Sequence, residues 1–275
     1  MTLTMNAVNN YQCLKNVGRS TTSQTWVVRE LHQENASLKI LQKLELHNDD
    51  DSVVKFAKTL LHHKSHTLQT LFNDIDSEYK IHDYFSDETA FCIVHSMVKG
   101  QALHCLDQQT PLTGQQQLVQ ILRLLQQAYS WGLSSCCLHP SDLIYRQLDG
   151  GWVWTGMGVL KTVVQQVCKM QVSLAELFPQ ETAAYFAPEC LQGKCNVSSD
   201  LYTVGVAIIQ ALTQLPLKDL VHGSDGCFTV RRGWYRQLNL PDNLVNVLSR
   251  MVNANAEKRY STVGAVLQDC ERIQA

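Results

Sequence analysis

The stretch that most constrains the fold is residues 131–158, WGLSSCCLHPSDLIYRQLDGGWVWTGMG. It follows an amphipathic pattern at residues 114–132, where apolar side chains recur at three- and four-residue spacing, as in a helix packed into a core. Two short β-rich runs, Leu143–Tyr145 and Trp152–Trp154, flank Asp149-Gly150-Gly151, and glycine tolerates the positive φ that a tight hairpin needs. The sequence therefore predicts a helix, a loop, a hairpin and a second loop, in this order.

The composition indicates a globular chain with a substantial core. It has 275 residues, of which 45% are hydrophobic, a normal size for one two-lobed unit. A net charge of −2 and a pI near 6.5 give no electrostatic reason to expect binding to nucleic acid or to a membrane. No run approaches the ~18 apolar residues of a membrane span, and the N-terminus does not read as a signal peptide. Ten irregularly placed cysteines favour free thiols, so we expect a cytoplasmic protein.

The first hundred residues predict a small sheet with one helix. His62 and His66 lie one helical turn apart and could bind zinc, but no cysteine or carboxylate at helical spacing completes a ligand set. A solvated polar face is therefore the preferred interpretation of these histidines. Residues 62–77 stay unassigned, and so does the tract at 214–236, where a surface-exposed Trp234 would indicate binding. The predicted strands are residues 11–17, 25–30, 37–41, 79–85 and 90–94, and the predicted helix is residues 53–61.

Three segments in the second half resemble motifs of a known family. They are Ala187-Pro188-Glu189, the run SDLYTVGV at residues 199–206, and the run NAEKRYS at residues 255–261. They resemble the A-P-E, S-D-x-Y-x-x-G-V and D-P-x-x-R-x-S motifs of the protein kinase superfamily, in particular its bacterial serine/threonine protein kinases. In the family the aspartate of the second motif, here Asp200, caps a helix start and hydrogen-bonds the backbone of the catalytic loop.

The resemblance implies an α+β, two-lobed protein kinase-like fold over residues 11–273. Its small, β-rich lobe with one helix would be residues 11–98, and its larger, mainly α lobe would be residues 99–273. The resemblance also implies that Arg259 pairs with Glu189.

The family's nucleotide-binding motifs are matched only in part. The loop GRSTTS at residues 18–23 resembles the glycine-rich loop with Gly18 kept, and Lys39 matches the lysine of V-A-I-K. Asp142 takes the place of the asparagine that holds a second metal ion. The resemblance therefore implies Gly18, Lys39 and Asp142 as nucleotide-binding residues; the alternatives are an ordinary turn, an exposed strand lysine and a loop aspartate that caps local amides. His95 would be either a wall of the adenine pocket or a partly buried strand histidine.

The departures from the family pattern fall where phosphoryl transfer is carried out. Cys137 stands in place of the aspartate that accepts the proton of the substrate hydroxyl, and Gly156 in place of the aspartate that binds magnesium. His139 replaces the catalytic-loop lysine, and no acidic residue lies at residues 57–60 to pair with Lys39. We therefore expect no catalytic residues and no metal site.

This pattern predicts a pseudokinase, a kinase-like module that acts by protein binding or allosteric control of a partner protein. No cofactor would be required, and any ATP binding would be weak and magnesium-independent. One alternative is an atypical ATP-dependent serine/threonine protein kinase that uses Lys39 and Asp142, with a displaced acid such as Asp149 as the base. The other is a sensor that binds ATP without catalysis. We expect neither nucleic acid nor membrane as a partner.

Overall fold

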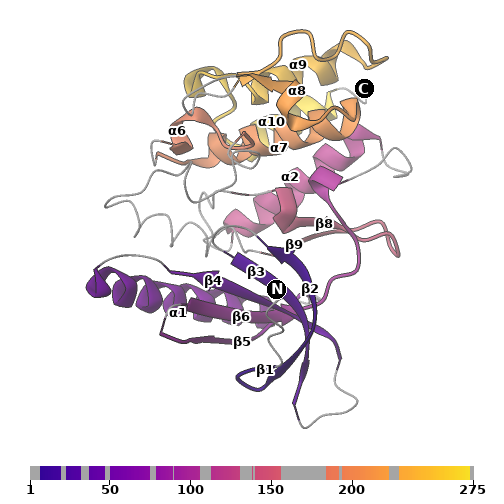
Figure 1. Cartoon of the computed structure of the whole chain (residues 1–275). Coiled ribbons are helices and arrows are strands. Elements are labelled where there is room, and N and C mark those ends of the chain that lie inside the picture. The colour runs from indigo at the N-terminus through magenta and orange to yellow at the C-terminus, as the bar shows by residue number, and fades with distance from the viewer. Residues whose placement is uncertain are drawn as a thin grey trace. The chain divides into compact units, whose positions relative to one another are not determined.

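The computed structural model describes residues 7–19, 23–31, 37–46, 50–74, 79–88, 90–105, 113–130, 138, 140–155, 184–191, 194–222 and 229–272. These residues fall into two compact units, one ending at Val98 and the other beginning at Lys99. The first unit holds a sheet and one long helix, and the second is mainly helical (Figure 1). The α+β, two-lobed class that the sequence predicts is the one observed.

Six antiparallel strands form the sheet of the first unit, in the order β1-β2-β3-β4-β6-β5. All five predicted strands are present, with ends that differ by a few residues, and β1 is additional. β1 and β2 are joined by a tight turn at Asn9, whose φ of 52° lies in the left-handed region that asparagine tolerates better than most residues. The strands are Ala7–Val8 (β1), Tyr11–Arg19 (β2), Ser23–Glu30 (β3), Lys39–Glu45 (β4), Ile81–Ser86 (β5) and Ala90–Ser96 (β6).

The register of this sheet assigns its side chains to two faces, because residues directly opposite each other in an antiparallel ladder lie on the same side. On the first face Leu41 lies opposite Trp26 on β3 and Val94 on β6. This face carries its own apolar cluster of buried side chains: Tyr11, Val28, Leu41, Cys92 and Val94.

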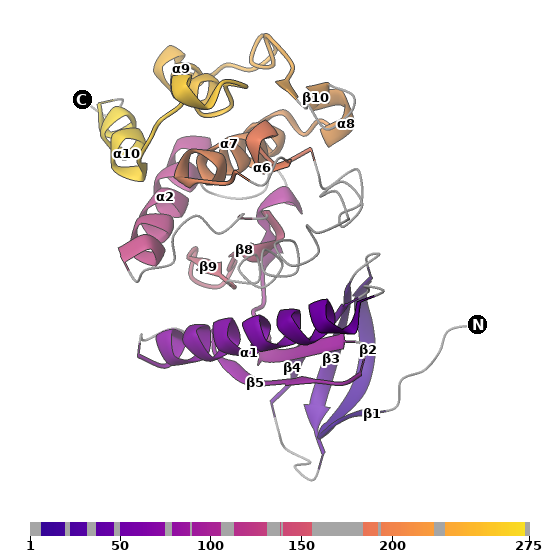
Figure 2. The same ribbon diagram turned by 90° about the vertical axis from the view of Figure 1, so that its left-hand side faces the viewer.

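Helix α1, Asp51–Asp74, covers the second face (Figure 2). The ring of His62 lies edge-on to Phe91 of β6 at 5.1 Å between centroids, and Phe72 lies edge-on to Tyr79 at 4.8 Å. The helix extends well past the predicted residues 53–61. Most of the tract left unassigned at residues 62–77 is therefore the second half of the same helix, held to β5 and β6 by apolar and aromatic contacts.

The histidines of α1 bind neighbouring side chains of β5. His62 Nε2 lies 3.3 Å from Ser86 Oγ, and His66 Nδ1 lies 3.2 Å from Tyr84 Oη. Among the described residues, no group of three His, Cys, Asp or Glu side chains is arranged to hold a metal ion. These two histidines therefore fasten the helix to the edge of the sheet.

The second unit is built on four helices: α2 (Gly114–Ser130), α7 (Val197–Thr213), α9 (Asp242–Met251) and α10 (Val263–Glu271). The predicted stripe of α2 is buried, including Leu118, Ile121, Leu122 and Leu125. Helix α7 is buried along most of its length and packs against α2 and α9. Gly205 permits the approach to α9, because a Cβ there would lie 2.8 Å from Val252 Cγ1.

The predicted hairpin is present as β8 (Leu143–Tyr145) and β9 (Trp152–Trp154), paired in antiparallel register. Gly150 takes the positive φ of 70° that the turn requires. A third short strand, β7 (Gln101–Ala102), pairs with the outer side of β8. It can do so because Gly100 lacks a side chain: a Cβ there would lie 2.2 Å from the carbonyl oxygen of Tyr145.

The tract at 214–236 contains short elements that the sequence left unassigned. They are helix α8 (Leu217–Leu220) and the paired strands β10 (Val221–His222) and β11 (Thr229–Val230). Trp234 is 7% exposed, so it anchors this region and does not present the surface-exposed indole that would have indicated binding. None of the described helices is long and apolar enough to span a lipid bilayer.

Candidate functional site

Lys39 forms an ion pair within the sheet of the first unit. Its Nζ lies 2.7 Å from Oε2 of Glu30 on the neighbouring strand β3 and 5.9 Å from the centre of the Tyr11 ring. The Lys39 side chain is 12% exposed and that of Glu30 is 32% exposed. The lysine therefore has an acidic partner, which the sequence did not indicate, and this partner comes from a strand.

The register explains why the partner of Lys39 is not on α1. Lys39 lies opposite Val28 and Ser96, which places it on the face of the Leu41 cluster, whereas α1 covers the opposite face. The β4 residue that faces α1 near the middle of the strand is Gln42, opposite Ile93. Helix α1 therefore has no acidic residue at 57–60, and Lys39 lies on the face of the sheet that α1 does not cover.

Gly18 lies in strand β2, directly after a register irregularity between Asn16 and Gly18. It pairs with Thr25, which in turn lies opposite Gln42, so Gly18 is offset from Lys39 by three residues, or about 10 Å, along the strand direction and by two strands across the sheet. A Cβ on Gly18 would meet Thr25 at an ordinary 3.6 Å. The local geometry therefore does not require glycine here. The central part of the predicted loop, residues 20–22, lies outside the described residues.

His95 is buried at the end of β6, with 6% of its surface exposed. Its Nδ1 lies 3.0 Å from the carbonyl oxygen of Ser96, which can only accept, so Nδ1 carries the hydrogen and donates the hydrogen bond. The ring also packs against Tyr79 at 5.2 Å. Burial lowers the pKa of His95 to about 4, and the residue is neutral at physiological pH. Of the two interpretations of His95, this geometry fits the buried strand histidine; the adenine-pocket role stays a prediction.

Asp142 ends a single 3-10 turn, Pro140–Asp142, that leads directly into β8. It is 3% exposed, and its backbone carbonyl accepts a hydrogen bond of 2.9 Å from the amide of Thr155, just after β9. The hairpin therefore fixes the backbone of Asp142. Gly18 and Lys39 lie in the same sheet of the first unit, whereas Asp142 belongs to the second unit. Cys137, His139 and Gly156 lie outside the described residues.

Asp200 connects three segments of the second unit. Its side chain is buried in the first turn of α7, accepting a hydrogen bond from Tyr129 Oη at 2.7 Å and from the backbone amide of Leu138 at 3.0 Å. The expected bond from Asp200 to the loop backbone is present. The expectation that Asp200 caps the helix is wrong, because the N-cap is Asn196, whose side chain accepts from Ser198 N and Ser199 N.

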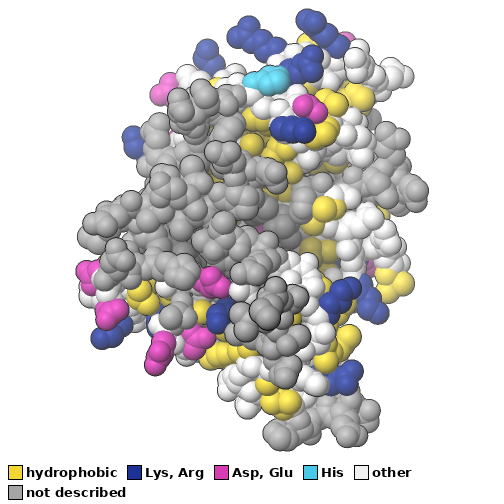
Figure 3. Space-filling view, viewed as in Figure 1, with side chains coloured by type: hydrophobic (Ala, Val, Ile, Leu, Met, Phe, Trp, Pro, Cys, Tyr) yellow, Lys and Arg dark blue, Asp and Glu magenta, His cyan; other side chains and the backbone are white. Residues whose placement is uncertain are grey.

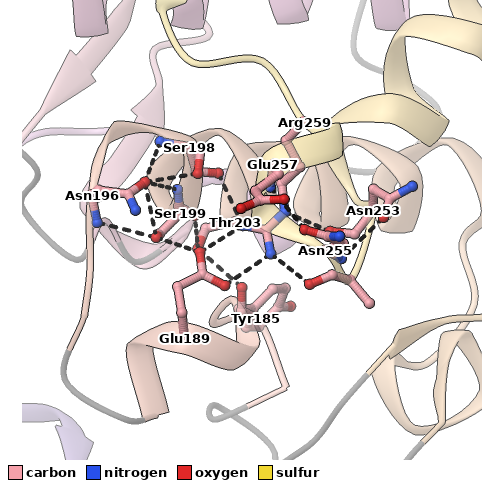
Figure 4. Close-up of polar contacts among 11 residues, drawn as sticks. Tyr185, Glu189, Asn196, Ser198, Ser199, Thr203, Asn253, Asn255, Glu257 and Arg259 are labelled. Carbon is pink, nitrogen blue, oxygen red and sulfur yellow. Dashed lines mark hydrogen bonds and ion pairs between the residues drawn. The ribbon is translucent and has the colours of Figure 1, made fainter.

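Glu189 and Arg259 form the ion pair that the sequence predicted (Figure 4). The two guanidinium NH groups reach the two carboxylate oxygens at 2.7 and 2.9 Å, and Ser199 donates a further bond of 2.6 Å to Glu189. The other N–H groups of Arg259 donate to the backbone carbonyls of Asn253, Ser198 and Ala254. All five N–H groups of this buried guanidinium therefore have an acceptor.

The environment of Glu189 favours its charged form. Burial alone raises the pKa of this carboxyl, but the hydrogen bonds from Arg259 and Ser199 outweigh burial and hold the pKa below its usual value. Motif matching included Glu189, Ser199 and Arg259 and predicted the pairing of Glu189 with Arg259, but it did not predict the bond from Ser199 to Glu189. The capping box, in which the Asn196 and Ser199 side chains bond to each other's backbone amides, fixes the Ser199 side chain at the start of α7 and was the signal that could have indicated its role.

The comparisons with known proteins agree with this architecture. No family model matches the sequence. Among curated proteins, the chain is 25% identical over 271 residues to Serine/threonine-protein kinase B of Synechocystis sp., covering 95% of this chain and 46% of that protein. It is 23% identical to Serine/threonine-protein kinase D of the same organism, covering 97% of this chain and 52% of that protein. The chain thus spans about half the length of the curated relatives it matches.

Solved structures show the same fold. The kinase domain of Mycobacterium tuberculosis PknI aligns with a TM-score of 0.63 and 16% identity, over 98% of both chains. Rad53 in complex with AMP-PNP aligns with a TM-score of 0.66 and 15% identity, over 94% of this chain and 64% of that one. At these identities the likeness concerns the fold alone.

Proposed function

Because the chain folds as a domain of the protein kinase superfamily, we propose that it is a pseudokinase-type module that regulates a partner protein and does not transfer phosphate. One contrast carries the proposal. The residues that maintain the fold, Asp200, Glu189 and Arg259, are fully bonded, whereas the sequence has Cys137 and Gly156 where the family has its base and its magnesium ligand. Loss restricted to the chemical positions is typical of a fold retained for binding.

The surroundings of Lys39 support weak nucleotide binding. Its ammonium is paired with Glu30 on the sheet face opposite α1, so contact with phosphates would require breaking this ion pair. Without an aspartate at position 156, magnesium would add little to the binding of ATP. We therefore propose that any ATP binding is weak and magnesium-independent.

The experiment combines two measurements on the purified chain. The first is phosphate transfer from radiolabelled ATP to casein and to the chain itself, which should stay at background. The second is the thermal unfolding midpoint with ATP, with and without magnesium. A ligand present at 100 times its dissociation constant would stabilise the chain by about 2.7 kcal/mol. Magnesium-dependent transfer that is lost in Lys39→Ala would overturn the proposal.

A second candidate is an atypical serine/threonine protein kinase, because the similar Synechocystis proteins are named serine/threonine-protein kinases. It would use Lys39 for phosphates and Asp142 for a metal ion. Asp149 is a poor base for it, because this carboxylate pairs with Arg146 and accepts the amide of Gly151 within the hairpin turn. Transfer that is lost in Asp142→Ala and kept in Asp149→Asn would establish this candidate with a different base. A third candidate, the ATP sensor, would show a thermal shift with ATP and no transfer.

A further inference from the structure

The six residues after β11, R-R-G-W-Y-R at 231–236, form a tight and well-anchored turn, which we call the arginine turn. The amide of Arg231 donates to the carbonyl of Leu220 in α8 at 2.8 Å, and the amide of Arg236 donates to the carbonyl of Gly233 at 3.1 Å. Gly233 has a φ of 72°, and Trp234 is buried beneath the turn. The backbone is thus fixed on both sides of the three arginines.

The charged groups of the arginine turn have no acidic partner among the described residues. Arg231, Arg232 and Arg236 are exposed, and none of them forms an ion pair with a described carboxylate. By contrast, Arg250 and Arg272 of the same unit both pair with Asp269, at 3.7 and 3.3 Å. Residues 216–241 hold four Lys or Arg and two Asp, a local charge of +2 in a chain whose net charge is −2.

The surface around the turn is mixed in charge but mainly basic. Lys218 and Asp219 of α8 and His222 of β10 are exposed in the neighbouring elements, and dark-blue side chains, with magenta ones among them, gather near α8 and α9 (Figure 3). Tyr235 is 39% exposed, and its ring lies edge-on to the buried Trp234 at 5.6 Å. The turn therefore offers three guanidinium groups and one rigid aromatic ring on a fixed backbone.

We propose that the arginine turn is a docking surface for an acidic, carboxylate-rich segment of a partner protein. Guanidinium groups form two-point hydrogen bonds with carboxylates, and arginine and tyrosine are the side chains enriched in protein interfaces. Nucleic acid fits less well, because it needs a longer basic track and the chain as a whole is slightly acidic. An anionic membrane fits less well too, because the larger apolar ring of the turn, Trp234, is buried.

The arginine turn would bind an acidic segment in either case, whether the partner is a protein that the module regulates or a substrate of an atypical kinase. The docking proposal therefore does not depend on the proposed function. Its failure is also separate from that of the proposed function, because peptide binding is measured without ATP.

The test is the binding of a fluorescein-labelled oligoglutamate peptide to the full chain at low salt, followed by fluorescence anisotropy. Arg231→Gln combined with Arg232→Gln should weaken binding about tenfold, because two exposed charge pairs with the peptide are lost. The matched control combines Arg250→Gln with Arg272→Gln, which removes the same charge elsewhere on the unit and should change binding less than about twofold. Thermal unfolding of both variants verifies that they are folded.

Three results would overturn the proposal. One is no binding of the peptide at low salt, and the second is equal weakening in the patch variant and the control. The third is tighter binding of a thymidine oligonucleotide or of phosphatidylserine vesicles that is lost in the patch variant, which would assign the surface to that ligand. Replacement by lysine refines the proposal: Arg231→Lys with Arg232→Lys keeps the charge and should weaken peptide binding less than the glutamine pair.

Discussion

Arg259 holds both carboxylate oxygens of Glu189, a residue 70 positions earlier in the chain, through hydrogen bonds of 2.7 and 2.9 Å. The pair joins the short helix α6, Pro188–Leu191, to the segment between α9 and α10. The arginine side chain is completely buried and the glutamate is 16% exposed.

Removing the arginine should destabilise the chain strongly. Arg259→Met leaves the carboxylate of Glu189 largely buried with Ser199 as its remaining side-chain donor, and it removes one hydrogen bond from each of three backbone carbonyls. We expect the free energy of unfolding to fall by about 3–5 kcal/mol. Urea denaturation measures it, with Arg272→Met, at a side chain 72% exposed, as the control expected to change by less than about 0.5 kcal/mol. Similar losses in both variants would contradict the prediction.

Glu189 should make the fold sensitive to acid. Its pKa in the folded chain is below its usual value, so the unfolded chain binds the proton more readily as the pH falls. The stability it contributes is complete above the unfolded pKa of about 4.5 and is lost as the pH falls through the folded pKa. Glu189→Gln should be less stable than the unchanged chain at neutral pH, and the difference should shrink below about pH 4. A constant difference across this range would count against it.

His95 should make the free energy of unfolding depend on pH in a second range, above that of Glu189. Its pKa of about 4 in the folded chain lies below the usual 6.5, so between these values the unfolded chain binds the extra proton. Stability should therefore decline as the pH falls from about 6.5 to 4, by up to about 3 kcal/mol, and this decline should be absent in His95→Phe. Urea titrations at a series of pH values measure it. His63→Phe, at an exposed histidine of α1, is the control and should keep the decline.

Two glycines should respond differently to the same change. Gly100→Ala would place a methyl group 2.2 Å from the carbonyl oxygen of Tyr145, so β7 must separate from β8. Gly18→Ala would meet Thr25 at 3.6 Å, an ordinary contact in a strand. We expect Gly100→Ala to lower the unfolding free energy by about 1–3 kcal/mol and Gly18→Ala to change it by less than about 0.5 kcal/mol. Equal effects in chemical denaturation would contradict this comparison.

The features predicted correctly from sequence share one property: each rests on residues at fixed spacing within a continuous pattern. The stripe of α2 and the turn at Gly150 follow from local periodicity and turn chemistry. The Glu189–Arg259 pair joins distant segments, and it was predictable only because both partners stand in motifs with a known mutual arrangement.

The register of β4 could not be predicted in the same way. The run KILQKLE has apolar residues at Ile40, Leu41 and Leu44, so they fall on both faces of the strand and do not fix which face is buried. The partner of Lys39 depends on this register. The length of α1 was missed for a related reason, because polar residues such as His62, His63 and His66 interrupt its apolar stripe where the helix lies along the edge of the sheet.

The position of Lys39 on the face away from α1 determines what kind of force retains that helix. An ion pair between a lysine of β4 and a glutamate of α1 would be a single contact that is either formed or broken, and dissolved salt would weaken it. Here the described contacts of α1 are ring packing, buried aliphatic side chains and hydrogen bonds to neutral acceptors. Two of these bonds come from ammonium groups, Lys58 to the carbonyl oxygen of Glu88 and Lys80 to that of Phe72. Such contacts depend little on ionic strength, because none of them joins two opposite charges. Packing and hydrogen bonds therefore hold α1 to its sheet, and its position does not depend on an ion pair with Lys39.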